Sequence, residues 1–412
     1  MKQDLDALMQ ADNVDALLVM GAGFHNPYMV YLTGGAHLTQ AMVLKKKGEA
    51  PVLFHESMER GEAQKTGLRT VNLSAYPVNE LARETGGDYL KASALRLEKV
   101  LRDQNLTEGR VALFGNQDAG IATSIVAEMR SRLPGLEFFG SARGGILMRA
   151  MASKDEQELA RIRKVGESTA RVVSNTADFL SSCRSQQDLL VDHNDHPVTI
   201  GQVKKKINLW LMEEGLENPE GTIFAIGRDA ALPHSSGNDQ DILRLGKTIV
   251  FDIFPCEAGG GYFHDFTRTW SLGYATDEAQ ALYFQVRDVF ERVVHSMMVD
   301  TPFSAYQKMV CEWFEELGHP SVMSDPATEN GYVHGLGHGV GLHVHELPFY
   351  AQSQGDENML RPGCVIAVEP GLYYPNREMG VRLENTYWID AAGKFNAFVD
   401  YPLDFVLPVK KS

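Results

Sequence analysis

Four acidic residues lie in or beside apolar, strand-like segments, where a carboxylate is costly to bury. They are Asp252 in IVFDIF, Asp265 in FHDFTRTW, Glu369 in VIAVEPG and Glu384 in GVRLEN. A carboxylate in a buried strand carries a large desolvation penalty unless it is paired or bound to a metal. One such residue is ordinarily a core acid with a satisfied partner, but four are hard to explain structurally. The pattern indicates a site that gathers cations.

A histidine cluster lies between the second and third of these acids. Four of the 13 histidines are His334, His338, His343 and His345, in the segment HGLGHGVGLHVHELP. The segment is too rich in glycine for a regular amphipathic helix, and in a β-strand His343 and His345 would share one face. Alone, the cluster fits a polar glycine-rich loop as well as a metal or catalytic site. The HExxH pattern of zincins is absent.

The acids and the histidines together favour metal-assisted hydrolysis. Four carboxylates would balance the charge of two divalent cations, and His338 would add one neutral nitrogen ligand. Such ligation suits Mn²⁺, Co²⁺, Fe²⁺ or Zn²⁺, and bridging carboxylates suit a metal pair about 3.5–4 Å apart. Water between two such ions loses a proton near neutral pH and becomes a nucleophile.

Two predicted hairpins would bring the acids together. The first joins the strands of Asp252 and Asp265 through the glycine-rich turn 258–261, and the second joins those of Glu369 and Glu384 through a turn over 370–380. The apolar runs predict strands over residues 222–225, 248–254, 266–272, 365–368 and 381–389.

The remaining pattern predicts an α/β region followed by a helix-rich one. Residues 1 to about 150 alternate short apolar runs with helical spacings, as in a self-contained α/β domain. Ser153 and Glu156 fit an S-x-x-E capping box at the start of a long helix. Further helices are predicted over residues 203–214, 277–298 and 304–317.

Composition excludes several functional classes. The 412 residues are 44% hydrophobic and 23% charged, with a net charge of −15. This balance argues against nucleic acid or an anionic membrane as the main partner. The four cysteines are far apart and show no CxxC pairing, which fits free thiols in a reducing compartment. Neither a signal peptide nor an apolar run of membrane-spanning length is found, so we predict a cytoplasmic protein.

The motifs around these residues resemble those of metallopeptidase family M24, which includes methionine aminopeptidase, aminopeptidase P and prolidase. The resemblance covers essentially the whole chain. It implies an α+β fold, with a pita-bread catalytic domain over residues 151–412. An α/β N-terminal domain of the creatinase and prolidase type would cover residues 1–150. Methionine aminopeptidases generally lack that domain, which favours the aminopeptidase P and prolidase branch.

The resemblance also implies the metal ligands one at a time. Asp252 would bind one ion, while His338 in GHGVGL and Glu369 in VEPG would bind the other. Asp265 in DFTRT and Glu384 in GVRLE would bridge both. The cofactors would be two divalent ions, with Mn²⁺ placed first and Co²⁺, Zn²⁺ or Fe²⁺ as alternatives.

Further residues match catalytic positions of the family. His234, His334 and His345 match histidines that in the family bind substrate and donate hydrogen bonds to the tetrahedral intermediate. Glu369 would carry a proton from the nucleophile to the leaving nitrogen. Arg382 would either add positive charge near the site or form a structural ion pair with a ligand carboxylate, and His343 matches no role. The catalytic candidates are His234, His334, His345, Glu369 and Arg382.

Two features depart from the family pattern. The separation between Asp252 and Asp265 is longer than is common, and the extra residues fall at the hairpin tip, 257–261. Asn385 follows Glu384 where the family commonly has an acid, which removes a charge beside the site.

We therefore predict a metal-dependent Xaa-Pro aminopeptidase that acts on small peptides with proline at the second position. A prolidase limited to dipeptides shares all the motifs and is the first alternative. A creatinase-like enzyme, a lyase or a binding module would have an altered ligand set, whereas this set is intact. Related proteins are often dimers, so we predict a homodimer with no nucleic-acid or membrane partner.

Overall fold

The computed structural model describes residues 4–141, 145–350 and 358–411. The chain divides into two units. The N-terminal unit comprises Met1–Met151 with Gly259–Gly261, and the C-terminal unit comprises Ala152–Ala258 with Tyr262–Ser412.

The N-terminal unit is built around a six-stranded sheet with the order β4-β3-β2-β1-β5-β6. Successive residues of β1 face opposite sides, and both sides are buried: Leu18 packs in one hydrophobic cluster, while Leu17 and Val19 pack in another. Helices therefore cover both faces, as the α/β pattern predicts. The strands are β1 (Ala16–Gly21), β2 (Ala41–Lys46), β3 (Val52–His55), β4 (Arg69–Asn72), β5 (Gly109–Gly115) and β6 (Leu136–Gly140). The α-helices are α1 (Leu5–Ala11), α2 (Pro27–Thr33), α3 (Arg60–Lys65), α4 (Val78–Glu84), α5 (Tyr89–Asp103), α6 (Ala119–Arg132) and α7 (Ile146–Met151).

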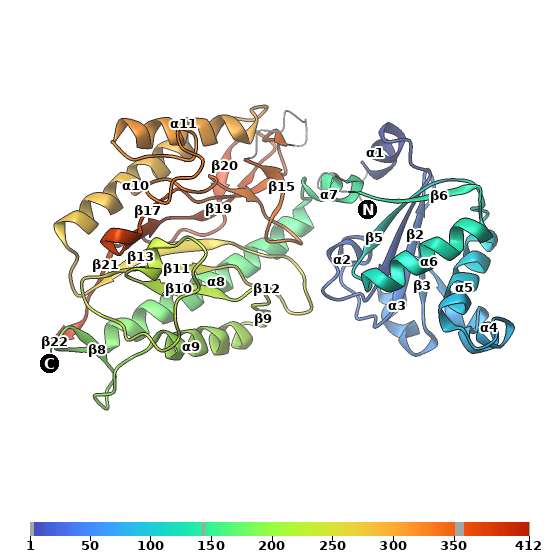
Figure 1. Ribbon diagram of the computed structural model, residues 1–412, viewed down its shortest axis with the longest axis horizontal. Helices are drawn as coiled ribbons and strands as arrows, with labels where there is room; N and C mark the ends of the chain where they lie inside the picture. The colour runs from blue at the N-terminus through green and yellow to red at the C-terminus, as the bar shows by residue number, and fades with distance from the viewer. Residues whose placement is uncertain (1–3, 142–144, 351–357, 412) are drawn as a thin grey trace. The chain divides into compact units, whose positions relative to one another are not determined.

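The C-terminal unit has two larger sheets, each packed against a pair of helices. The helices α8 (Glu156–Ser182) and α9 (Ile200–Glu213) share a hydrophobic core with the sheet β10-β11-β13-β21. The helices α10 (Asp277–Ser296) and α11 (Phe303–Glu316) share another with strands of the sheet β15-β14-β16-β19-β20. Figure 1 shows the two helix pairs on opposite sides of the strands.

The acids lie in or directly beside strands of these two sheets. The first sheet consists of β10 (Thr222–Ile226), β11 (Thr248–Ile253), β13 (Phe266–Leu272) and β21 (Val406–Leu407). The second consists of β14 (His338–Gly339), β15 (Glu346–Phe349), β16 (Val365–Val368), β19 (Asn385–Ile389) and β20 (Phe395–Ala397). Short strands complete the unit: β7 (Arg184–Gln186), β8 (Leu189–Val191), β9 (Leu216–Glu217), β12 (Cys256–Glu257), β17 (Gly371–Tyr374), β18 (Met379–Arg382) and β22 (Lys410–Lys411).

The first predicted hairpin forms as expected, and the second is more elaborate. Strands β11 and β13 are antiparallel, with Asp252 opposite Thr267. Strands β16 and β19 are also antiparallel, with Val368 opposite Asn385. The segment between them is not a simple turn, because β17 and β18 form a hairpin of their own there. The predicted strand 381–389 is accordingly split into the end of β18 and the whole of β19.

One local prediction is wrong, and one conditional expectation does not apply. His343 and His345 would share a face only in a strand, and they lie on a bend that precedes β15. The capping box of α8 is formed by Asp155 and Glu158 and not by Ser153 and Glu156. The S-x-x-E pattern precedes the true cap by two residues, because Ser153 instead pairs with Cys364 in a β-bridge. No helix in the described part of the chain is long and apolar enough to cross a lipid bilayer.

The cap of α8 gives a test of the fold. Replacing Asp155 with Ala leaves the Gln157 and Glu158 amides without their acceptor and should lower the free energy of unfolding by about 1 kcal/mol. Urea denaturation followed by circular dichroism measures this change. Ser153→Ala is the matched control and should have a smaller effect; the reverse ranking would contradict the assigned cap.

Candidate metal and catalytic site

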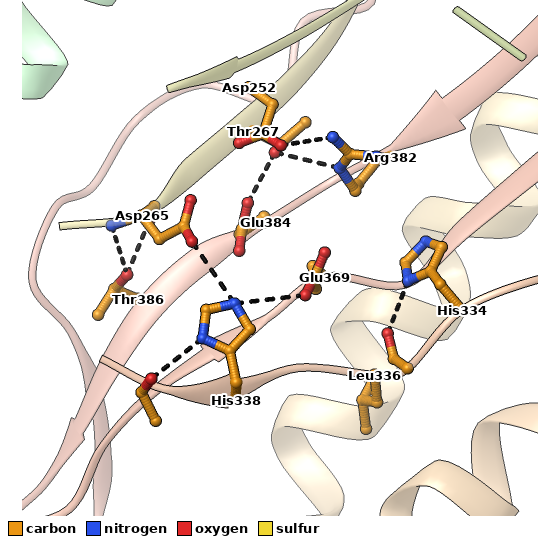
Figure 2. Close-up of polar contacts among 12 residues, drawn as sticks. Asp252, Asp265, Thr267, His334, Leu336, His338, Glu369, Arg382, Glu384 and Thr386 are labelled. Carbon is orange, nitrogen blue, oxygen red and sulfur yellow. Dashed lines mark hydrogen bonds and ion pairs between the residues drawn. The ribbon is translucent and has the colours of Figure 1, made fainter. Parts of the chain in front are cut away.

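The four predicted acids and His338 form one cluster where the two sheets meet (Figure 2). The ligand atoms of Asp265, His338 and Glu384 all lie within 4.8 Å of one another. His338 Nε2 is 3.5 Å from Asp265 Oδ2 and 3.6 Å from Glu369 Oε1. In Figure 2, Asp265 and Glu384 lie between Asp252 and His338, as bridging groups would.

The cluster has acceptor oxygens that the protein does not satisfy. Among the described residues, Asp252 Oδ1, Asp265 Oδ1 and Glu384 Oε1 are buried without a hydrogen-bond partner. An orphaned acceptor on a buried carboxylate costs on the order of 1–3 kcal/mol or more. Three such oxygens in one cluster form a donor set that divalent cations fit.

The electrostatics of the cluster lead to the same conclusion. Burial, with repulsion from Asp252 and Glu369, raises the pKa of Asp265 well above its usual range. Burial and the Asp265 charge do the same to the pKa of Glu384, and burial raises the pKa of Glu369 to about 8. Burial lowers the pKa of His338 to about 3, so its imidazole is neutral and can act as a ligand.

Two roles were predicted for Arg382, a structural ion pair and a positive charge near the site, and its contacts are compatible with both. Its Nη2 lies 2.5 Å from Asp252 Oδ2, so it forms an ion pair with a predicted ligand carboxylate and is itself 2% exposed. The same guanidinium donates to the Tyr373 hydroxyl at 2.8 Å and to the Pro233 carbonyl at 3.1 Å. It therefore orients Asp252 and also brings one positive charge to the acids.

Tyr373, which the sequence analysis did not select, links Arg382 to His334. Its hydroxyl accepts from Arg382 and lies 2.9 Å from His334 Nε2. His334 Nδ1 lies 2.7 Å from the Gly335 carbonyl, so we assign the ring proton to Nδ1 and the Tyr373 proton to the Nε2 contact. Burial lowers the pKa of His334 to about 3, which keeps the ring neutral. Tyr373 lies in the apolar run GLYY, where nothing in the sequence marks it.

The other two predicted histidines lie at the border of the cluster. The ring of His345 is exposed, and its centroid is 4.1 Å from that of His338. His234 is also exposed and follows Pro233, the carbonyl of which Arg382 holds. His343, for which no role was predicted, is half-buried on the same bend as His345.

Gln307 on α11 is a second residue that the sequence did not reveal. Its Oε1 accepts from the Leu336 amide at 2.6 Å and from the Tyr332 hydroxyl at 3.1 Å. Its Nε2 donates to the His334 carbonyl at 3.4 Å. One amide side chain thus fixes the backbone on both sides of Gly335, between two predicted site histidines.

Thr267 and Arg268 fix the strands that carry the acids. Thr267 Oγ1 donates to Glu384 Oε2 at 2.6 Å. The Arg268 guanidinium donates to the carbonyls of Thr267 and Glu384 at 2.9 Å, and to Asn385 Oδ1 at 3.0 Å. Asn385, the unusual residue of the motif, therefore anchors Arg268 without neutralising it.

Comparison with known proteins identifies the family. Residues 160–391, more than half of the chain, match the model of metallopeptidase family M24. The chain belongs to this family and is therefore a hydrolase of the metallopeptidase class. The predicted family is confirmed.

Similarity to individual proteins extends over nearly the whole chain. The chain is 26% identical to an Xaa-Pro dipeptidase of Pyrococcus horikoshii over 393 residues, 93% of each sequence. It is 33% identical to an Xaa-Pro dipeptidase of Pyrococcus furiosus over 196 residues, which cover 47% of this chain and 51% of the relative.

Solved structures confirm the predicted fold class. An X-Pro aminopeptidase from Thermotoga maritima superposes with a TM-score of 0.73 at 22% identity, covering 96% of this chain and 98% of that one. The prolidase from Pyrococcus horikoshii gives a TM-score of 0.72 at 21% identity, covering 98% and 99%. At such identities the likeness establishes the two-domain fold and no more.

The raised pKa values predict an unusual pH dependence of stability without metal. Glu369 has a pKa of about 8 when folded and a usual value of 4.5, so between these pH values the folded state binds the proton more tightly. Unfolding then releases protons, and the metal-free protein should become less stable as pH rises from about 5 to 8. Thermal melting after chelator treatment measures this slope.

Two comparisons make this pH test specific. Glu369→Gln should make the slope shallower and leave the part that comes from Asp265 and Glu384, whereas Glu378→Gln, at an exposed glutamate, should leave it unchanged. Adding Mn²⁺ should reverse the trend, because the metal competes with protons for the same oxygens. A metal-free protein that gains stability with rising pH would contradict the electrostatics described above.

Proposed function

We propose that the protein is a prolidase, a metal-dependent dipeptidase that cleaves the bond between a first residue and a proline. The sequence motifs alone predict an Xaa-Pro aminopeptidase, with prolidase as the first alternative. The relatives favour the reverse order, because both sequence relatives described above are named Xaa-Pro dipeptidases. Xaa-Pro aminopeptidase remains the second candidate, since the T. maritima enzyme has the same fold.

The observation that carries the proposal is the buried cluster of four carboxylates and His338. We propose that it holds two divalent cations, with Mn²⁺ first and Co²⁺, Zn²⁺ or Fe²⁺ as alternatives. Asp252 would serve one cation, His338 and Glu369 the other, and Asp265 and Glu384 both. When bound, such ions supply a water of lowered pKa and stabilise negative charge on a carbonyl oxygen. The three orphaned carboxylate oxygens support this assignment.

Glu369 is the proposed proton carrier. It is the least buried of the cluster acids, with a side chain that is 19% exposed, so a bound peptide can reach it. The nitrogen of an Xaa-Pro bond carries no hydrogen, and its departure as an amine requires a proton from a nearby acid. Glu369 would take that proton from the nucleophile and deliver it to the proline nitrogen.

The three histidines would act in two ways. His345 and His234 are exposed beside the cluster, where a ring N–H can donate to the carbonyl oxygen of the scissile bond. Both ring nitrogens of His334 are already engaged, by Gly335 and Tyr373. We therefore propose that His334 contacts substrate through its ring and not through a hydrogen bond.

The remaining predictions concern the setting of the enzyme. We propose a homodimer in the cytoplasm that acts on small peptides, with neither nucleic acid nor membrane as partner. The acidic net charge of −15 supports the last point, because it opposes binding to polyanions.

A peptide screen separates the two candidate activities. With Mn²⁺ present, a prolidase should hydrolyse Ala-Pro and leave Ala-Pro-Ala intact, because its site would accept the free carboxylate of proline. Release of alanine from both peptides would instead identify an aminopeptidase. If Mn²⁺, Co²⁺, Zn²⁺ and Fe²⁺ all fail to support cleavage of either peptide, the proposed function is wrong.

Removal of a ligand should abolish both metal binding and activity. His338→Ala and Glu384→Ala should each lose bound metal and at least about 100-fold in kcat/KM, because each removes a group that would hold the cations. Metal content by mass spectrometry and dipeptide hydrolysis are the measurements. His196→Ala, at an exposed histidine, is the control and should retain both. Full activity in Glu384→Ala would refute the ligand assignment.

A further inference from the structure

One buried ion pair lies beside the cluster without belonging to it. Lys154, just before the cap of α8, is paired with Glu346 at the start of β15, and their side chains are 1% and 0% exposed. Replacing such a pair with apolar residues of similar volume is often neutral or stabilising. Stability alone therefore does not account for a pair of charges at this place.

The Glu346 carboxylate is packed inside the bend 341–345. Gly341 approaches it so closely that a Cβ at this position would overlap the carboxylate. The His343 amide points at Glu346 Oε2 from 3.5 Å, and the Gly341 amide donates to the His343 carbonyl at 3.0 Å. The backbone of the bend is thus packed closely around the Glu346 carboxylate.

The bend connects the ion pair with the cluster. It begins just after β14, which carries His338, and it ends at His345, whose ring packs on His338. The Phe263 amide donates to the Gly341 carbonyl at 2.7 Å, which ties the bend to the segment that leads into Asp265. A shift of the bend would therefore move His345 relative to the ligands.

Lys154 gives the carboxylate a fixed position. Its own amide donates to the Gly363 carbonyl at 2.9 Å, just before β16, so its backbone is held by the sheet that carries Glu369. Its ammonium group is also 3.5 Å from the Ala152 carbonyl. The ion pair therefore ties Glu346 to a backbone position that the sheet holds.

We propose that Lys154 and Glu346 are positioning residues, which hold the bend 341–345 so that His345 lies over His338 and faces the peptide carbonyl. The proposal rests on the proposed function, in which His345 donates a hydrogen bond to that carbonyl. An apolar pair could fill the same volume, but it could not hold the His343 amide or set the direction of the contact.

The central test removes both charges while keeping the volume. The double variant Lys154→Met/Glu346→Leu should melt within a few degrees of wild type, because no unpaired charge is left buried. Its kcat on an Xaa-Pro dipeptide should nevertheless fall at least about tenfold, with KM changed less than about threefold, because a small misplacement affects the reaction more than binding. A double variant with native melting and native kcat would overturn the proposal.

A second, more exposed ion pair serves as the control for the change of charge. Arg171 on α8 pairs with Glu214 at 2.6 Å, far along the sequence from the bend, and the two side chains are 54% and 28% exposed. The variant Arg171→Met/Glu214→Leu makes the same change of charge and should retain kcat. An equal loss of kcat in this control would also overturn the proposal.

A second variant keeps the test valid if the double variant does not fold. Gly341→Ala retains both charges but places a methyl group where the Glu346 carboxylate packs. It should lower kcat as the double variant does, while the affinity for Mn²⁺ measured by calorimetry changes less than about threefold. Native kcat in Gly341→Ala would overturn the proposal.

A readout without catalysis separates this inference from the proposed function. Histidine labelled at Cε1 gives an NMR signal for His345, which is assigned through its loss in His345→Ala. This signal should shift in Lys154→Met/Glu346→Leu and in Gly341→Ala. It should stay in place in Arg171→Met/Glu214→Leu. If wild type cleaves no Xaa-Pro peptide but the signal shifts, the proposed function fails and the positioning role survives. An unmoved signal in both variants overturns the positioning role.

Discussion

Repulsion among buried carboxylates is the constraint on which the C-terminal unit depends. Four acids share a small volume, and burial and mutual repulsion raise the pKa values of three of them. Arg382 offsets part of this repulsion through Asp252, but three oxygens keep no partner among the described residues. Such a cluster is costly without cations, so binding of metal and stability of this unit should be strongly linked.

The two larger sheets of the C-terminal unit are joined beside these carboxylates. Thr267 of β13 and Glu384 form a backbone bridge, in which the Glu384 amide donates to the Thr267 carbonyl at 3.1 Å. The Thr267 side chain also holds one oxygen of Glu384. The helix pairs on the outer sides of the sheets stabilise this junction by burying apolar surface. The site therefore exists only when both halves of the unit are assembled.

The sequence predicted those site residues whose type is unusual for the segment in which they lie. A carboxylate in an apolar strand stands out, so the four acids and His338 could be selected, and the continuous apolar runs placed β11, β13 and β16, which are buried along their whole length. Tyr373 and Gln307 could not be found in this way, because a tyrosine in a strand and a glutamine on a helix are ordinary there. Their importance depends on hydrogen bonds to residues far along the chain, which local patterns do not contain. The β17–β18 hairpin was missed for a similar reason, since glycines and prolines within 370–380 resemble a plain turn.

The neutral residue at position 385 affects the charge of the whole site. Arg268 is buried, and in the described part of the chain it donates only to carbonyl and amide oxygens, with Asn385 among them. Burial lowers its pKa to about 10, so it remains charged at neutral pH. An acid at position 385 would pair with the Arg268 charge. Asn385 does not neutralise it, so the positive charge of Arg268 interacts with the Glu384 carboxylate. With two divalent cations balancing the four carboxylates, Arg268 and Arg382 would leave an excess of positive charge at the site. Under the proposed function, such an excess would favour a substrate that brings its own carboxylate close to the scissile bond, as a dipeptide ending in proline would and a longer peptide would not.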